Sequence, residues 1–209
     1  MKSEGAKRLV VGMSGSSGAI LGIRLLQILR ESAIETHLVL SRAARLTITE
    51  ETQWTVREVQ ALADVVYPVS AIGAAIASGS FATLGMVIVP CSIKTLSAVA
   101  NSYADDLLIR AADVTLKEGR PLVLVVRETP LHRGHIRLMD LAAQAGAIIF
   151  PPVPTFYTRP QSIDEMVDHL AGRILSRVGI ENPHTQVWRG TGRAPSAEAL
   201  PPADELDAE

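Results

Sequence analysis

Residues 8–18 read RLVVGMSGSSG, an apolar run followed at once by a turn of glycine and serine. From Ala19 to Glu31 the apolar side chains then recur at helical spacing. A buried strand, a tight turn and a helix in this order predict the first unit of a parallel α/β sheet. In such a unit the turn lies at the carboxyl end of the strand, where open α/β sheets bind ligands.

The same alternation continues along the chain. Further strands are predicted at residues 36–40, 65–67, 86–89, 122–126 and 147–150, with Pro90 ending the strand before it. Further helices are predicted at residues 55–63, 96–101, 105–118, 136–145 and 162–178, and one more after Ser41, which is a typical N-cap. This order predicts a doubly wound, mostly parallel sheet of the Rossmann-like or flavodoxin-like kind.

Bulk composition narrows the class of protein. A length of 209 residues suits one sizeable core, so residues 1–189 are predicted to form a single domain and residues 190–209 a flexible tail. A net charge of −2 argues against a nucleic-acid partner, and the apolar runs are too short to span a membrane. The only cysteine, Cys91, excludes an intrachain disulfide, so a cytoplasmic protein is expected.

Polar side chains follow five of the predicted strands. They are Ser14, Ser16, Ser17, Ser41, Ser92, Lys94, Thr95, Arg127, Glu128, Thr155 and Tyr157. Because the carboxyl ends of parallel strands meet at one edge, this set predicts a crevice for a phosphorylated ligand. Loops at strand ends are polar in any case, so it is the coincidence of five ends that favours a site.

Gly12, Gly15 and Gly18 form a candidate phosphate cradle. Glycines allow close backbone approach, and the following helix offers free N–H groups. The motif is not the dinucleotide-binding G-x-G-x-x-G, because Met13 stands where that motif needs glycine. The next strand ends in Ser41 rather than in a carboxylate for a ribose. Both features favour a mononucleotide such as FMN over NAD, and a tight turn without ligand remains the alternative.

Other reactive residues have plainer interpretations. Cys91 beside an apolar strand is more often core than nucleophile. His132 and His135 lack further partners at ligand spacing, which favours a loop role. The pair Asp105-Asp106 lacks the further aspartate of a magnesium-diphosphate motif, so no metal is predicted. By spacing alone, Arg110 and Lys117 share one helix face and are most simply solvated surface charge.

Five stretches together carry a resemblance to a known family. They are residues 15–19 (GSSGA), 90–97 (PCSIKTLS), 110–114 (RAADV), 121–131 (PLVLVVRETPL) and 156–162 (FYTRPQS). In combination they resemble the UbiX/Pad family of flavin prenyltransferases, over about residues 8–188. Ser16 and Thr158 depart from the alanine and histidine common in that family.

The resemblance implies roles for individual residues. Residues implied to hold FMN are Gly15, Ser16, Ser17, Ser41, Ser92, Ile93, Lys94, Thr95 and Arg127. Those implied to bind the phosphate of dimethylallyl monophosphate, some of them from neighbouring subunits, are Lys117, Arg127, Tyr157 and Arg173. Those implied to be catalytic are Ser17, Glu51 and Glu128, with Arg110 in support and Trp188 closing over the site. The roles of Glu51, Arg110, Lys117, Arg173 and Trp188 rest on the resemblance alone.

The activity implied is transfer of a dimethylallyl group to N5 and C6 of reduced FMN without a metal. The resemblance also implies a homododecamer with sites at subunit interfaces, and a UbiD-type decarboxylase as recipient of the prenylated FMN. Three alternatives stay open: an FMN-dependent cysteine decarboxylase, a decarboxylase or decarboxylase subunit for aromatic acids, and a non-enzymatic flavin carrier. The Pro90–Lys94 loop differs from that of cysteine decarboxylases, and one flavin crevice in a chain of this size suits a cofactor-making enzyme.

Overall fold

The computed structural model describes residues 7–183, 185, 187, 188 and 190. Over these residues, the strands of its parallel sheet are β1 Arg8–Met13, β2 Glu35–Leu40, β3 Val65–Tyr67, β4 Met86–Cys91, β5 Leu122–Val126 and β6 Ile148–Ile149. The helices are α1 Ala19–Arg30, α2 Arg42–Glu51, α3 Val56–Gln60, α4 Ile93–Ala100, α5 Leu107–Lys117, α6 Arg133–Gln144 and α7 Ile163–Ser176, with a 3₁₀ turn, η1, at Ala75–Ala77. Apart from Gly190, the tail predicted at residues 190–209 lies outside the described residues.

The strand order confirms the doubly wound prediction. The strands lie in the order β3-β2-β1-β4-β5-β6, and every pairing in this sheet is parallel. The chain winds outward from β1 in one direction, then returns to place β4 on the other side of β1. This reversal opens a crevice beyond the carboxyl ends of β1 and β4, where open α/β sheets bind ligands.

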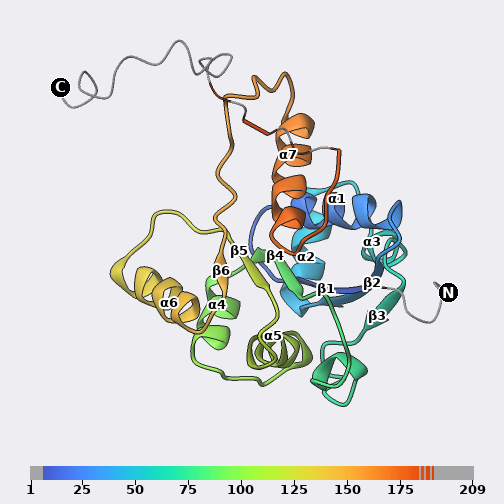
Figure 1. The fold of residues 1–209 in the computed structure, drawn as a ribbon, viewed down its shortest axis with the longest axis vertical. Helices are drawn as coiled ribbons and strands as arrows, with labels where there is room; N and C mark the ends of the chain where they lie inside the picture. Colours follow the sequence, from blue (N-terminus) through green and yellow to red (C-terminus); the bar gives the residue numbers. More distant parts are fainter. Residues whose placement is uncertain (1–6, 184, 186, 189, 191–209) are drawn as a thin grey trace, which may run out of the picture.

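Two apolar layers bury both faces of the sheet (Figure 1). Leu9, Val11 and Met13 of β1 pack with α1 and α7, whereas Val10 packs on the opposite face with α4 and α5. Strands covered on both faces read as continuous apolar runs, which is why the residues of β1 were recognisable from sequence. Within the described part of the chain, no helix has the length and apolar character needed to cross a bilayer.

Several element boundaries differ from the prediction, and two of these differences shape the site. The strand expected to end before Pro90 continues to Cys91, with a register shift between Ile88 and Cys91 that accommodates a residue without an N–H. The next helix begins at Ile93 rather than Leu96, because Ser92 Oγ accepts the N–H of Thr95 as an N-cap. Both changes bring the polar residues after β4 onto the first turn of α4.

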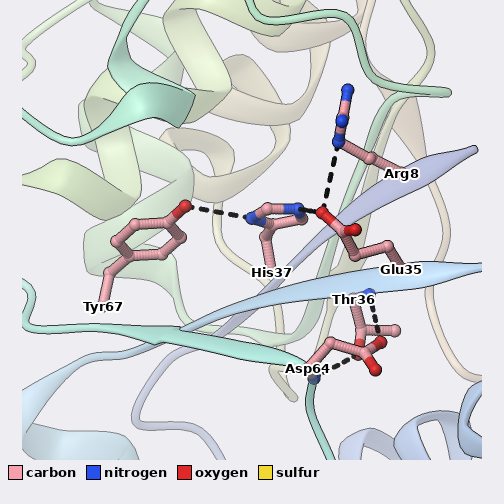
Figure 2. Close-up of polar contacts among 6 residues, drawn as sticks. All are labelled: Arg8, Glu35, Thr36, His37, Asp64 and Tyr67. Atoms are coloured by element: carbon pink, nitrogen blue, oxygen red, sulfur yellow. Dashed lines mark hydrogen bonds and ion pairs between the residues drawn. The ribbon is translucent and has the colours of Figure 1, made fainter. Parts of the chain in front are cut away.

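A series of hydrogen-bonded polar side chains, with the buried His37 at its centre, joins β1, β2 and β3 (Figure 2). His37 Nδ1 lies 3.0 Å from Tyr67 Oη, and His37 Nε2 lies 2.8 Å from Glu35 Oε1, which also accepts from Arg8 Nε at 3.2 Å. With His37 neutral and protonated on Nε2, the Tyr67 hydroxyl donates to the ring and the ring donates to Glu35. Every contact is therefore satisfied without a charge on the imidazole.

The burial of His37 among these hydrogen bonds predicts that the stability of the protein depends on pH. Burial lowers the pKa of His37 below 6.5, and this effect outweighs the hydrogen bond to Glu35. Below pH 6.5 the unfolded chain binds a proton at this residue more readily than the folded chain does, so the free energy of unfolding should fall as pH is lowered through that window. Urea unfolding of the wild type at pH 7.5 and pH 5.5 measures the fall.

The variant His37→Gln supplies the control. It keeps a polar group but cannot titrate, so its unfolding free energy should change less between the two pH values. At pH 7.5 it should be destabilised by about 1–3 kcal/mol, because Tyr67 or Glu35 loses a buried partner. An equal pH dependence in variant and wild type would show that carboxylates, and not His37, govern this range.

Candidate active site

A cavity of about 620 Å³ lies at the carboxyl ends of β1, β2 and β4. Its lining comes from the turn after β1, the first turns of α2 and α4, and the start of α5. The lining residues are Ser14, Gly15, Ser41, Arg42, Ala43, Leu46, Val69, Ser92, Lys94, Thr95, Ala98, Asp105, Asp106, Leu108 and Ile109. The volume is that of a small-molecule site. Three of the five predicted strand ends thus meet around one cavity.

Two helix N-termini border this cavity. Ser41 Oγ accepts from Ala44 N at 3.0 Å to cap α2, just as Ser92 Oγ caps α4. In the described part of the chain, the amides of the first two residues of each helix have no acceptor. The side chains of Arg42 and Lys94 line the same space. Free amides, two positive helix ends and two cations suit the phosphate of a mononucleotide.

The glycine turn after β1 is shaped by close packing. A Cβ on Gly15 would lie 2.2 Å from Ala43 Cβ, so only glycine lets the turn approach α2. Gly18 has a φ of 104°, a left-handed conformation that other residues rarely adopt. Ser14 Oγ donates to Pro90 O and accepts from Ser92 N, so it ties this turn to the one after β4. The Ser16 hydroxyl is buried without a partner among the described residues, which leaves it available to a ligand.

Glu51 corrects the prediction of a phosphate at the start of α1. Its Oε2 accepts from Gly18 N at 2.8 Å and from Ala19 N at 3.2 Å, so a carboxylate already occupies that helix end. Among the described residues, amides at the starts of α2 and α4 remain without an acceptor beside the cavity. Ser17 directly precedes Gly18, and the fold thus brings Ser17 and Glu51 to the same helix start beside the cavity.

Two residues of α5 do not reach the cavity of their own chain. The Arg110 guanidinium donates to Asp113 at 2.8 Å, and the Lys117 ammonium pairs with Glu118 at the end of the helix. Ile109 lines the cavity, and Lys117 lies about 12 Å further along the helix axis. A role for Lys117 at a phosphate therefore requires the cavity of another chain.

Four more of the predicted site residues lie outside the cavity lining. Arg127 and Glu128 follow β5 and are exposed. Tyr157 and Trp188 contact one another edge to face, with ring centroids 5.4 Å apart. Their roles stay predictions.

Arg173 is the fifth such residue. It lies on α7, partly exposed, and its guanidinium makes no ion pair with any described residue. Within the described part of its own chain it is therefore not held in a salt bridge, the arrangement that would have argued against contact with a ligand.

The histidine pair lies at the start of α6, and not in a loop as had been predicted. His132 is the N-cap of α6, and its Nδ1 accepts from Gly134 N at 3.0 Å. The rings of His132 and His135 contact one another at a tilt of 37°, with centroids 3.7 Å apart. Among the described residues, no group of three histidine, cysteine or acidic side chains is arranged to hold a metal.

The thiol of Cys91 should be unreactive in the folded protein. Its side chain is fully buried, and burial raises the pKa of the thiol far above its ordinary value. We expect no reaction with Ellman's reagent until denaturant unfolds the chain, and Cys91→Ala should retain turnover within a few-fold of wild type. Rapid labelling of the native protein together with loss of turnover in the variant would instead make Cys91 a nucleophile.

The cavity and the strand order define an α/β protein with a site suited to a mononucleotide. A family model described as Flavoprotein matches residues 1–175. The flavin prenyltransferase UbiX of Escherichia coli (strain K12) is 60% identical over 187 residues, covering 89% of this chain and 99% of that protein. This chain belongs to the UbiX family of flavin prenyltransferases.

Solved structures agree with this assignment. AnUbiX (PadA1), in complex with FMN and dimethylallyl pyrophosphate, superposes with a TM-score of 0.87 at 47% identity, over 89% of this chain and 99% of that one. A dodecameric FMN-dependent Ubix-like decarboxylase from Escherichia coli O157:H7 gives a TM-score of 0.85 at 47% identity, over 88% of this chain and all of that one. The resemblance inferred from the five sequence stretches is thereby confirmed.

Proposed function

We propose that the protein transfers a dimethylallyl group from dimethylallyl monophosphate to reduced FMN. The observation that carries the proposal is a phosphate-suited cavity at the switch point of a chain 60% identical to a flavin prenyltransferase. When bound, the reduced flavin would supply the nucleophile: N5 would bond to the dimethylallyl carbon as its carbon–oxygen bond to phosphate breaks. The second bond, to C6, would then use the electrons of the allyl double bond, which takes up a proton while C6 loses one. All other steps fall to side chains of the protein.

The flavin phosphate is proposed to lie between the N-termini of α2 and α4. Ser41 and the residues from Ser92 to Thr95 contribute hydroxyls and amides there, and Lys94 contributes charge. Gly15, Ser16 and Ser17 would contact the flavin beyond its phosphate. The unpartnered Ser16 hydroxyl and the close approach of Gly15 to α2 support this placement.

Glu51 is proposed to act as the base. Two amides hold Oε2 at the start of α1, which leaves Oε1 to take the proton released from the ring carbon that forms the second bond. Ser17 lies beside Glu51, and either Ser17 or Glu128 would pass a proton to the departing phosphate.

The departing phosphate requires fixed positive charge. Lys117, Arg127 and Arg173 are proposed to supply it, with Tyr157 as a hydrogen-bond donor, because cations in a dry site stabilise charge that develops in a transition state. Lys117 and Arg173 lie away from the cavity of their own chain, so neighbouring subunits would contribute them. A homododecamer is proposed on this ground, supported by the dodecameric relative.

The product would serve a UbiD-type decarboxylase in the cytoplasm, consistent with a chain that has a single, buried cysteine. The relative described as a decarboxylase supports a second candidate function, in which the protein itself removes carbon dioxide from an aromatic acid. The two functions differ in product and can be tested in one assay.

The test incubates purified protein with chemically reduced FMN and dimethylallyl monophosphate, without oxygen and with EDTA present. The expected result is a flavin whose mass has increased by one isoprene unit. Parallel reactions offer cinnamic acid as substrate, or NAD in place of FMN, and neither should bind or react. An unchanged flavin mass together with release of carbon dioxide from the acid would establish the decarboxylase instead.

A further inference from the structure

The ring of Tyr157 is contacted from two sides by parts of the chain that are distant in sequence. Its centroid lies 6.0 Å from that of His169 on α7, and 5.4 Å from that of Trp188 beyond the helix. The interplanar angles are 89° and 72°, so both contacts are edge to face. Edge-to-face pairs depend on ring orientation and therefore restrain how a side chain is turned.

Backbone contacts alone do not fix this ring. Tyr157 sits in a turn closed by the hydrogen bond from Arg159 N to Phe156 O at 3.0 Å. The Tyr157 side chain is 43% exposed, and the adjacent Phe156 is 73% exposed, so the turn lies largely outside the core. Packing in the interior gives Tyr157 little support, so the two ring contacts contribute to its orientation.

Trp188 reaches Tyr157 because the chain folds back along α7 (Figure 1). Asn182 Nδ2 donates to Gly172 O at 3.0 Å and fixes the returning segment to the helix. A Cβ on Gly172 would lie 2.6 Å from Thr185 Oγ1, so glycine at this position allows the close approach. Asn182 and Thr185 thus lie against α7 ahead of Trp188 in the chain.

His169 is the buried member of this group. Its side chain is 5% exposed, whereas Trp188 is 56% exposed. Arg173 follows His169 by four residues on α7, and side chains with that spacing lie on the same helix face. His169 therefore contacts the ring of Tyr157 and lies one helical turn from Arg173, the two residues proposed to bind the donor phosphate.

We infer that His169 is a positioning residue for the prenyl donor site. The buried His169 ring sets the orientation of the Tyr157 ring relative to Arg173, and through Tyr157 it also sets the orientation of Trp188. A planar ring is needed at this position, since an aliphatic side chain of similar size would fill the space without favouring one orientation of Tyr157. The inference rests on the proposed donor-binding function of Tyr157 and Arg173, and it concerns a residue that neither the strand-end pattern nor the family resemblance pointed to.

The test compares His169→Leu with His169→Phe in the full-length protein loaded with FMN. Leu removes the ring and should raise the KM for dimethylallyl monophosphate about three- to tenfold, the factor that corresponds to one aromatic pair. The kcat and the Kd for FMN should stay within about twofold of wild type on the same grounds. Phe restores a ring and should return the KM toward the wild-type value.

Fluorescence provides a readout that does not depend on turnover. In a Trp54→Phe background Trp188 is the remaining tryptophan. Its emission should become more accessible to iodide quenching in His169→Leu and return toward wild type in His169→Phe. Ile180→Val, which trims the core cluster that packs α7, controls for general loosening and should change neither the quenching nor the KM.

The outcomes separate this inference from the proposed function. If the wild type transfers a prenyl group but His169→Leu has an unchanged KM and unchanged quenching, the inference is wrong. It is equally wrong if His169→Phe is as impaired as His169→Leu. If the wild type transfers no prenyl group, the proposed function fails, and unchanged or changed quenching in His169→Leu still decides whether His169 orients the rings.

Discussion

Glu51→Gln is expected to slow prenyl transfer by about a hundred- to ten-thousandfold, the usual contribution of a general base. The glutamine can still accept the N–H groups of Gly18 and Ala19, so the start of α1 should keep its structure. FMN should bind normally, because the cavity lining does not include Glu51. A large fall in kcat with little change in FMN affinity is therefore the expected pattern, measured by single-turnover formation of prenylated flavin.

The neighbouring Glu50 is the matched control. It is exposed on the same helix and makes no hydrogen bond through its side chain to any described residue. Glu50→Gln removes the same charge from the same end of α2 and should turn over like wild type. If Glu51→Gln also keeps wild-type turnover, Glu51 is a structural cap of α1 and the base must be sought elsewhere.

Arg173→Ala is expected to lower kcat/KM for dimethylallyl monophosphate about ten- to a hundredfold, since one charge-assisted hydrogen bond contributes about 1.5–3 kcal/mol. The FMN Kd should not change. Arg173 lies on α7 and is not among the residues that line the cavity of its own chain. Arg177→Ala, one helical turn further on and exposed, is the control and should have little effect.

Mixed assemblies test whether Arg173 acts across subunits. Co-expressed Arg173→Ala and Glu51→Gln chains can form sites in which one chain supplies Glu51 and its neighbour supplies Arg173. Partial recovery of activity in the mixture, absent from either variant alone, is expected if the site is shared. Failure to recover, with assembly confirmed by light scattering, would place both residues in the site of one chain.

The strands, helices and caps that depend on residues adjacent along the chain could be predicted from the sequence. The apolar run at β1, its glycine turn and the periodicity of α1 predicted the first unit, because a strand buried on both faces and an amphipathic helix have different repeats. Ser41 was recognisable as an N-cap from its position before a helical pattern. The polar residues after each strand were identified for the same local reason, and the parallel order of strands then implied that their ends would meet.

Contacts between segments that are distant in sequence became known only from the tertiary structure. Glu51 meets the start of α1 from 33 residues away, and its carboxylate occupies the helix end that the glycine turn had suggested for a phosphate. The chain from Tyr67 through His37 to Glu35 forms only because β3 pairs with β2. Asp105 and Asp106 line the cavity, although as sequence they served only to argue against a metal. The periodicity of a sequence indicates which face of a helix or strand is buried. Which side chains that face contacts depends on strand pairing and helix packing, and these contacts cannot be predicted from a local sequence pattern.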